Sequence, residues 1–203
     1  MSRRTKRGAG IVAVLASLTL VAAACSSDGS SSSGGGTTAP AAAEPFGSTC
    51  SQLPTSGAGS FEGMMTAPVG EAAATNPLLS SLVMDLDLAG LTDTLNSAEG
   101  LTVFAPTNDA FAAAGEADPD GMAAMMADPT GAFAGLLSYH VVEGQLAPDQ
   151  LAGEHTTLQG DPLTVAGSGE SFTVNGTAMV VCGDIHTDNA TVYMIDEVLH
   201  PPM

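Results

Sequence analysis

Lysine and arginine are almost absent from this sequence of 203 residues. The four that occur lie within the first seven residues, whereas 22 aspartates and glutamates are spread over the remainder. Without the first seven residues the formal net charge would change from −18 to −22. Such a chain offers no cationic surface to a phosphate backbone, which argues against nucleic acid as a partner. It also lacks the lysine or arginine that a P-loop, a Schiff base or a carboxylate clamp requires.

Catalytic signatures are missing as well. The sequence contains no nucleophile elbow, and many of its serines lie in a Ser/Gly-rich stretch near the N-terminus. None of the acidic residues has a spacing that singles out a pair for general acid and base chemistry. We therefore expect a protein that is not an enzyme and that needs no cofactor or metal.

The first 24 residues have the pattern of an export signal. A basic segment is followed by an apolar run from Ile11 to Ala24, which is too short and too rich in alanine for a membrane span. The sequence Val-Ala-Ala-Ala before Cys25 resembles a bacterial lipobox, so we expect Cys25 to be the lipidated first residue of the mature protein. An ordinary signal peptide that leaves Cys25 as a free thiol is the alternative.

Residues 25–49 are expected to form a flexible linker between the lipid anchor and the folded domain. The segment is rich in Ser, Gly, Thr, Pro and Ala, and Phe46 is its one large apolar residue. It cannot bury enough apolar surface to offset the entropy of ordering. Residues 50–203 then remain as a single domain, long enough for a core of its own.

Two cysteines are left in that domain, Cys50 and Cys182. In an oxidising exterior an even pair is most simply a disulfide, worth about 5 kcal/mol as an upper figure for so long a loop. A metal site is the alternative, but the close Cys/His spacing of such sites is absent.

Helical patterns precede strand patterns along the domain, which predicts an α+β fold. Asn76-Pro77 is typical of a helix start, and leucines follow at helical spacing. Residues 101–105 and 139–142 are predicted strands, and Asn175-Gly176 is a strong hairpin signal between later strands.

Three segments resemble the signature regions of the fasciclin family. The sequence TVFAPTNDAF at 102–111 resembles the first box, and LSYHVVEG at 137–144 resembles the Tyr-His motif region. The sequence NATVYMIDEVL at 189–199 is similar to the closing strand. The lipid anchor and the cysteine pair further resemble single-domain mycobacterial surface and secreted antigens of this family. The resemblance implies a β-sandwich or wedge of about seven strands with helices packed along one side.

The resemblance also identifies candidate binding residues. Tyr139 and His140 form the motif that is linked to cell adhesion in animal relatives, and Asn108 and Asp109 lie in the neighbouring box. The alternative for His140 is a buried core histidine, because the valines that follow it are typical of a core strand.

Two further patterns have competing interpretations. Asp184, His186 and Asp188 would share one face of a regular strand and suggest a divalent-metal site, although such spacing is common by chance. Met122, Met125 and Met126 lie at helical spacing and would suit a groove for a lipid or another apolar ligand. Methionines are also ordinary core residues in a chain without tryptophan.

The sequence as a whole favours a lipid-anchored surface protein that acts by binding, through adhesion or contact with a protein or envelope component. The alternative function is a carrier or sensor of a small apolar ligand. We expect the protein at the extracellular face of the cell membrane, or released from it.

Overall fold

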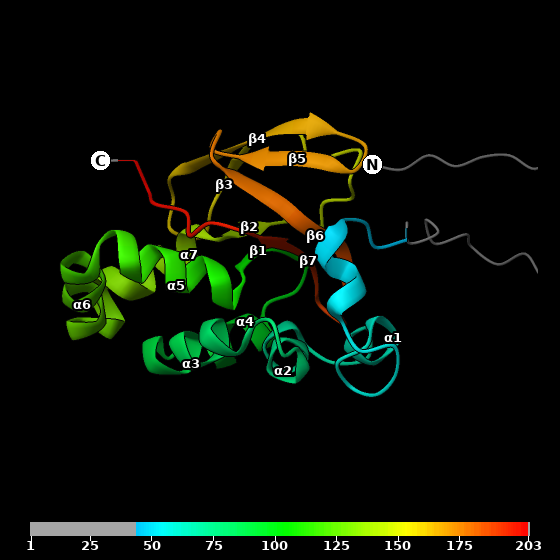
Figure 1. Cartoon of the computed structure of the whole chain (residues 1–203), viewed down its shortest axis with the longest axis horizontal. Coiled ribbons are helices and arrows are strands. Elements are labelled where there is room, and N and C mark those ends of the chain that lie inside the picture. The colour runs from blue at the N-terminus through cyan, green and yellow to red at the C-terminus, as the bar shows by residue number, and fades with distance from the viewer. Residues whose placement is uncertain (1–43, 203) are drawn as a thin grey trace, which may run out of the picture. The chain divides into compact units, whose positions relative to one another are not determined.

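The computed structural model describes residues 44–202 of the chain. The predicted signal peptide, Cys25 and residues 26–43 of the predicted linker lie outside the described residues. Helices dominate the first half of the domain (Figure 1). They are the 3₁₀ turn η1 (Ser48–Gln52), α1 (Phe61–Met64), α2 (Val69–Thr75), α3 (Ser80–Ala89), α4 (Thr92–Ser97), α5 (Asn108–Ala117), α6 (Pro119–Ala127), the π-helical turn η2 (Pro129–Phe133) and α7 (Ala134–Tyr139).

Within residues 44–202 the strands form one seven-stranded sheet with the order β2-β1-β7-β6-β5-β4-β3. Strands β1 and β7 are parallel, and the other neighbouring pairs are antiparallel. A bridge between Val142 and Thr157 connects the two edges, so the sheet curls almost into a barrel. The strands are β1 (Leu101–Pro106), β2 (Val141–Glu143), β3 (Gly153–Thr156), β4 (Pro162–Ser168), β5 (Ser171–Val174), β6 (Ala178–His186) and β7 (Ala190–Ile195).

The helices cover one side of this sheet (Figure 1), which confirms the predicted α+β class and the strand number. Two apolar clusters result. The larger one lies between the helices and the sheet and includes Leu82, Phe133 and Ile185. The other fills the inside of the curled sheet around Phe104 and Tyr193. Strands β1 and β7 are buried along their whole length because they separate the two clusters.

The folded domain begins before Cys50. Phe46 is only 7% exposed, and its backbone exchanges two hydrogen bonds with Gly183, of 3.1 and 2.8 Å. The predicted linker boundary at residue 49 is therefore a few residues too late, because Phe46 packs on the aromatic rings of Phe172 and Tyr193.

The predicted disulfide is present. It joins Cys50 and Cys182, whose sulfur atoms are 2.01 Å apart, and it ties η1 to β6. Among the helices of residues 44–202, none has the length and apolar character needed to cross a membrane.

The helix predicted to start at Asn76-Pro77 begins later than predicted, since α3 starts at Ser80. The hairpin at Asn175-Gly176 is confirmed, since both residues have the positive φ values (51° and 76°) of a tight turn between β5 and β6. The strand predicted for residues 139–142 is wrong at its start. Tyr139 ends α7, His140 has helical dihedral angles, and β2 begins at Val141.

Candidate functional site

Tyr139 and His140 lie in the interior, 1% and 2% exposed. The Tyr139 hydroxyl donates to the carbonyl of Pro162 at 3.0 Å and accepts from the Asn175 side chain at 2.8 Å. These bonds fix α7 against β4 and the turn between β5 and β6. Neither side chain reaches the surface, so neither contacts a partner directly while this fold persists. A role of this motif in binding has to be one of positioning.

His140 holds the C-terminal segment of the domain. Its Nε2 atom accepts from the backbone N–H of Leu199 at 2.9 Å, so the proton of the neutral ring lies on Nδ1. That atom donates to the carbonyl of Leu136 at 2.8 Å. Burial lowers the pKa of His140 from 6.5 to about 4, because the charged ring would lose its hydration. The ring is therefore neutral at physiological pH and serves as a fixed clamp.

Asn108 connects two helices. Its Oδ1 atom accepts from the backbone N–H of Ser81 at 2.9 Å in the first turn of α3, and its Nδ2 donates to the carbonyl of Pro77. The cap of α5 itself is Thr107, whose hydroxyl accepts from Ala110 N–H at 3.3 Å. Asn108 is thus largely engaged in the fold, whereas its neighbour Asp109 is exposed to solvent.

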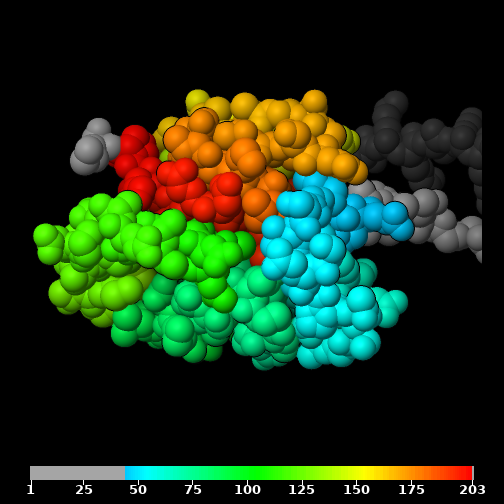
Figure 2. All heavy atoms as spheres, in the orientation of Figure 1, coloured from blue at the N-terminus to red at the C-terminus, as the bar shows by residue number. Residues whose placement is uncertain are grey.

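A surface groove runs along α5 beside the C-terminal segment 196–201. Three adjoining hollows form it, of about 380, 270 and 640 Å³. The first two share Ala113, and the second and third share Met125 and His200, so the hollows are neighbours on the surface. Figure 2 shows the C-terminal segment between α5 and the strands. We call this feature the α5 groove.

The α5 groove combines apolar walls with carboxylates. Its apolar lining comes from alanines of α5 and from Met122, Met125, Leu136 and Val198. The acidic lining residues are Asp109, Asp196, Asp118 and Glu197. His200 is the one lining side chain that can carry a positive charge, because the described residues contain no lysine or arginine.

The structure brings together two of the three residues suggested as metal ligands. The Nε2 atom of His186 lies 3.3 Å from Oδ1 of Asp184. A β-bulge gives Asp184 a φ of 60° and buries its carboxylate, whereas Asp188 is exposed. Burial raises the pKa of Asp184, and the neighbouring imidazole opposes this shift. Within residues 44–202 no three acidic, histidine or cysteine side chains are arranged to hold a metal ion.

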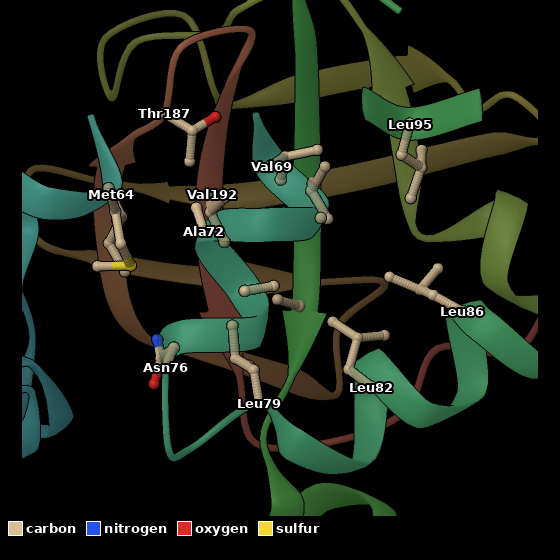
Figure 3. A pocket seen from close by; sticks show the side chains of 15 residues that line it. Met64, Val69, Ala72, Asn76, Leu79, Leu82, Leu86, Leu95, Thr187 and Val192 are labelled. Carbon is tan, nitrogen blue, oxygen red and sulfur yellow. The ribbon is translucent and has the colours of Figure 1, made fainter. Parts of the chain in front are cut away.

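An apolar cavity lies inside the domain, between α2–α4 and the sheet (Figure 3). Its lining includes Met64, Leu79 and Val192, and Asn76 is the one buried amide beside it. Its volume is about 20 Å³, which corresponds to about one water molecule. A lipid chain does not fit in this cavity without displacement of core side chains.

Sequence reasoning identified several residues that line the α5 groove but did not identify the groove. Asn108 and Asp109 line its first hollow, and His140 fixes the segment that forms one wall. Met122 and Met125 line the second hollow, as their helical spacing suggested, whereas Met126 does not line it. The signal that was available is the alanine periodicity of α5, at positions 110, 113, 114 and 117.

Comparison with known proteins gives a consistent result. The sequence model of the Fasciclin domain matches residues 77–201. The chain is 44% identical over 170 residues to the cell surface glycolipoprotein MPB83 of Mycobacterium bovis, which covers 79% of this chain and 74% of that protein. It is 43% identical over 171 residues to the immunogenic protein MPT70 of Mycobacterium tuberculosis, with 80% and 85% covered.

A solved structure has the same fold at low sequence identity. It is the FAS1 domain pair of the insect cell adhesion molecule Fasciclin I, with a TM-score of 0.56 and 15% identity. The match covers 68% of this chain and 52% of that chain.

Proposed function

This chain belongs to the fasciclin domain family, and we propose that it is a lipid-anchored surface protein whose domain acts by binding, without catalysing a reaction. The relatives named as cell surface glycolipoproteins support the location. The apolar run that ends at Cys25 supports the lipid anchor. The partner is a protein or another component of the cell envelope.

The observation that carries the binding role is the α5 groove. Both fasciclin motif regions contribute to it, Asp109 by lining it and His140 by holding Leu199 in the adjoining segment. The buried Tyr-His motif therefore acts on the surface indirectly, through the position of the segment that forms one wall of the groove. Loss of the motif would change binding through displacement of residues 196–201.

The binding role is tested on cells that display the full chain. The Ala113→Gln variant places a long polar side chain at the junction of two hollows, on an exposed helix position. The matched control is Ala123→Gln, also exposed on a helix but outside the groove. We expect crosslinking on intact cells followed by mass spectrometry to recover a partner with the wild type and the control, and not with Ala113→Gln. Identical crosslinks for all three proteins would contradict the role of the groove.

Location and anchoring are tested separately. Labelled palmitate should be incorporated into the wild type and not into the Cys25→Ala variant. Surface exposure should be probed with proteinase K rather than trypsin, because no lysine or arginine follows Arg7. Protection of the domain in intact cells would contradict the surface location.

A second candidate function is that of a carrier for a small apolar ligand, which the lining of the second hollow by Met122 and Met125 favours. The interior cavity is too small for this purpose, so the ligand would lie in the α5 groove. Native mass spectrometry of the protein purified from its own envelope would reveal a bound molecule. A mass without any adduct would exclude a tightly held ligand.

A further inference from the structure

We propose that the α5 groove binds a basic and apolar peptide segment of a partner protein. The inference rests on the proposed function and specifies the chemistry of the occupant. It goes beyond that function because adhesion by itself does not require a charged partner.

The length of the groove suits a peptide. Helix α5 has ten residues, which corresponds to about 15 Å, and the third hollow continues beyond its end. An extended segment of at least about five residues covers that distance. The shared lining residues Ala113, Met125 and His200 place the three hollows next to one another, so an extended segment can lie across them.

The walls of the groove suit apolar side chains. Val198 and Leu136 are 2% and 3% exposed and Met122 is 8% exposed, so these side chains form an apolar floor with little accessible surface of their own. The alanine side chains of α5 are small, so side chains of a bound segment can approach the helix backbone closely. Met125 is partly exposed between the second and third hollows and can adapt its rotamer to different apolar side chains.

The charges select the sign of the partner. Asp109 and Asp196 lie along the first hollow, and Asp118 and Glu197 lie along the second. No lysine or arginine side chain of the described residues neutralises them. Lysine or arginine side chains of a partner would form ion pairs with these carboxylates. Electrostatic complementarity would also accelerate the encounter of the two proteins.

The same charges disfavour the other occupants of such a groove. A second copy of this chain has no lysine or arginine beyond Arg7 and would be repelled. Fatty acids and anionic lipid headgroups would bring further negative charge next to Asp118 and Glu197. A neutral apolar ligand would form no ion pair with the exposed Asp109 and Glu197, whereas Asp118 and Asp196 already accept hydrogen bonds from the backbone N–H groups of Gly121 and Met179.

The test uses the full chain in nanodiscs of zwitterionic phosphatidylcholine and three fluorescent peptides of equal length. The first alternates leucine with lysine, the second leucine with glutamate, and the third serine with lysine. We expect anisotropy titrations to detect saturable binding of the leucine–lysine peptide, with affinity at least about tenfold above that for either control peptide, and weaker binding at higher salt.

Two pairs of variants localise the binding. Asp109→Asn combined with Glu197→Gln should weaken the leucine–lysine peptide about tenfold, whereas Glu143→Gln combined with Glu170→Gln changes the net charge equally at exposed positions outside the groove. Ala113→Gln should weaken binding of the leucine–lysine peptide by a similar factor, and Ala123→Gln should leave it unchanged. Unchanged melting temperatures would exclude unfolding as the cause.

Each contrary outcome overturns a specific part of the inference. Equal binding of the serine–lysine peptide would show that the overall negative charge alone attracts the peptide. Equal weakening of peptide binding by both double charge variants would show the same. Equal binding of the leucine–glutamate peptide would identify an apolar site without charge selection. If the cell crosslinks depend on Ala113 and no lysine-containing peptide binds, the proposed function stands and the basic partner is wrong.

Discussion

The Nε2 atom of His140 and the backbone N–H of Leu199 form a hydrogen bond of 2.9 Å between residues 59 positions apart in the sequence. This bond fastens the C-terminal segment to the end of α7, and the opposite ring nitrogen is bonded to Leu136. His140, which sequence analysis selected as a binding residue, is therefore a buried residue that holds two segments of the backbone together. Its effect on the surface passes through the position of residues 196–201.

Replacement of His140 by alanine should destabilise the domain by about 3 kcal/mol. The change leaves the Leu199 N–H and the Leu136 carbonyl without partners and creates a cavity in a fully packed region. Urea unfolding of the full chain measures this loss. His140→Gln offers an acceptor and a donor on one side chain and should recover part of it. A variant His140→Ala with wild-type stability would contradict the clamp.

The loss of stability between pH 6.5 and 4 should be smaller than His140 alone would cause, because two buried carboxylates oppose it. The pKa of His140 is lowered to about 4, so the unfolded chain takes up a proton first on acidification and stability falls by up to about 3 kcal/mol. The pKa of Asp85 is raised from 3.8 to about 6 by burial, so the folded chain takes up a proton first and stability rises by a similar amount. Buried Asp184, whose pKa is also raised, acts in the same direction as Asp85.

The variant Asp85→Asn separates these contributions. It should be more stable than the wild type at pH 7 and should lose more stability than the wild type as the pH falls toward 4, since the gain from protonation of Asp85 is removed. The control Glu154→Gln alters an exposed carboxylate and should keep the wild-type profile. Urea midpoints at four or five pH values provide the measurement, and parallel profiles for Asp85→Asn and wild type would contradict the assignment.

Reduction of the Cys50–Cys182 disulfide should lower the free energy of unfolding by about 2–4 kcal/mol. The bond closes nearly the whole domain into one loop, and it holds η1 and Phe46 against β6. Thermal unfolding with and without reductant measures the difference. A Cys50→Ala and Cys182→Ala double variant should be insensitive to reductant, and an unchanged wild-type melting curve would be inconsistent with the bond.

Asn108 and Asp109 should behave differently although they are adjacent. Asn108→Ala removes the acceptor for Ser81 N–H and the donor to the Pro77 carbonyl, and should cost about 1–2 kcal/mol of stability. Asp109→Asn should leave stability within about 0.5 kcal/mol and should weaken binding in the α5 groove. Urea unfolding and peptide binding, measured for both variants, distinguish the two roles. Equal stabilities for the two variants would contradict the role of Asn108 in connecting α3 and α5.

The sequence by itself determined the features that depend on a few neighbouring residues. The β1 strand and the hairpin at Asn175-Gly176 follow from local preferences of strand and turn. The disulfide follows from the count of cysteines, and family membership follows from three short segments in order.

Only the tertiary structure decided how distant segments combine. Tyr139 has a sequence neighbourhood typical of a strand, but packing of α7 against the sheet makes it the last residue of a helix. Asn108 is the first residue of α5, but its side chain accepts from the first turn of α3 because the start of α3 lies beside it in space. The bulge that buries Asp184 and the α5 groove both join elements that are remote in the chain. Local patterns carry no information on such contacts, because their free energy arises only when the sheet and helices have packed together.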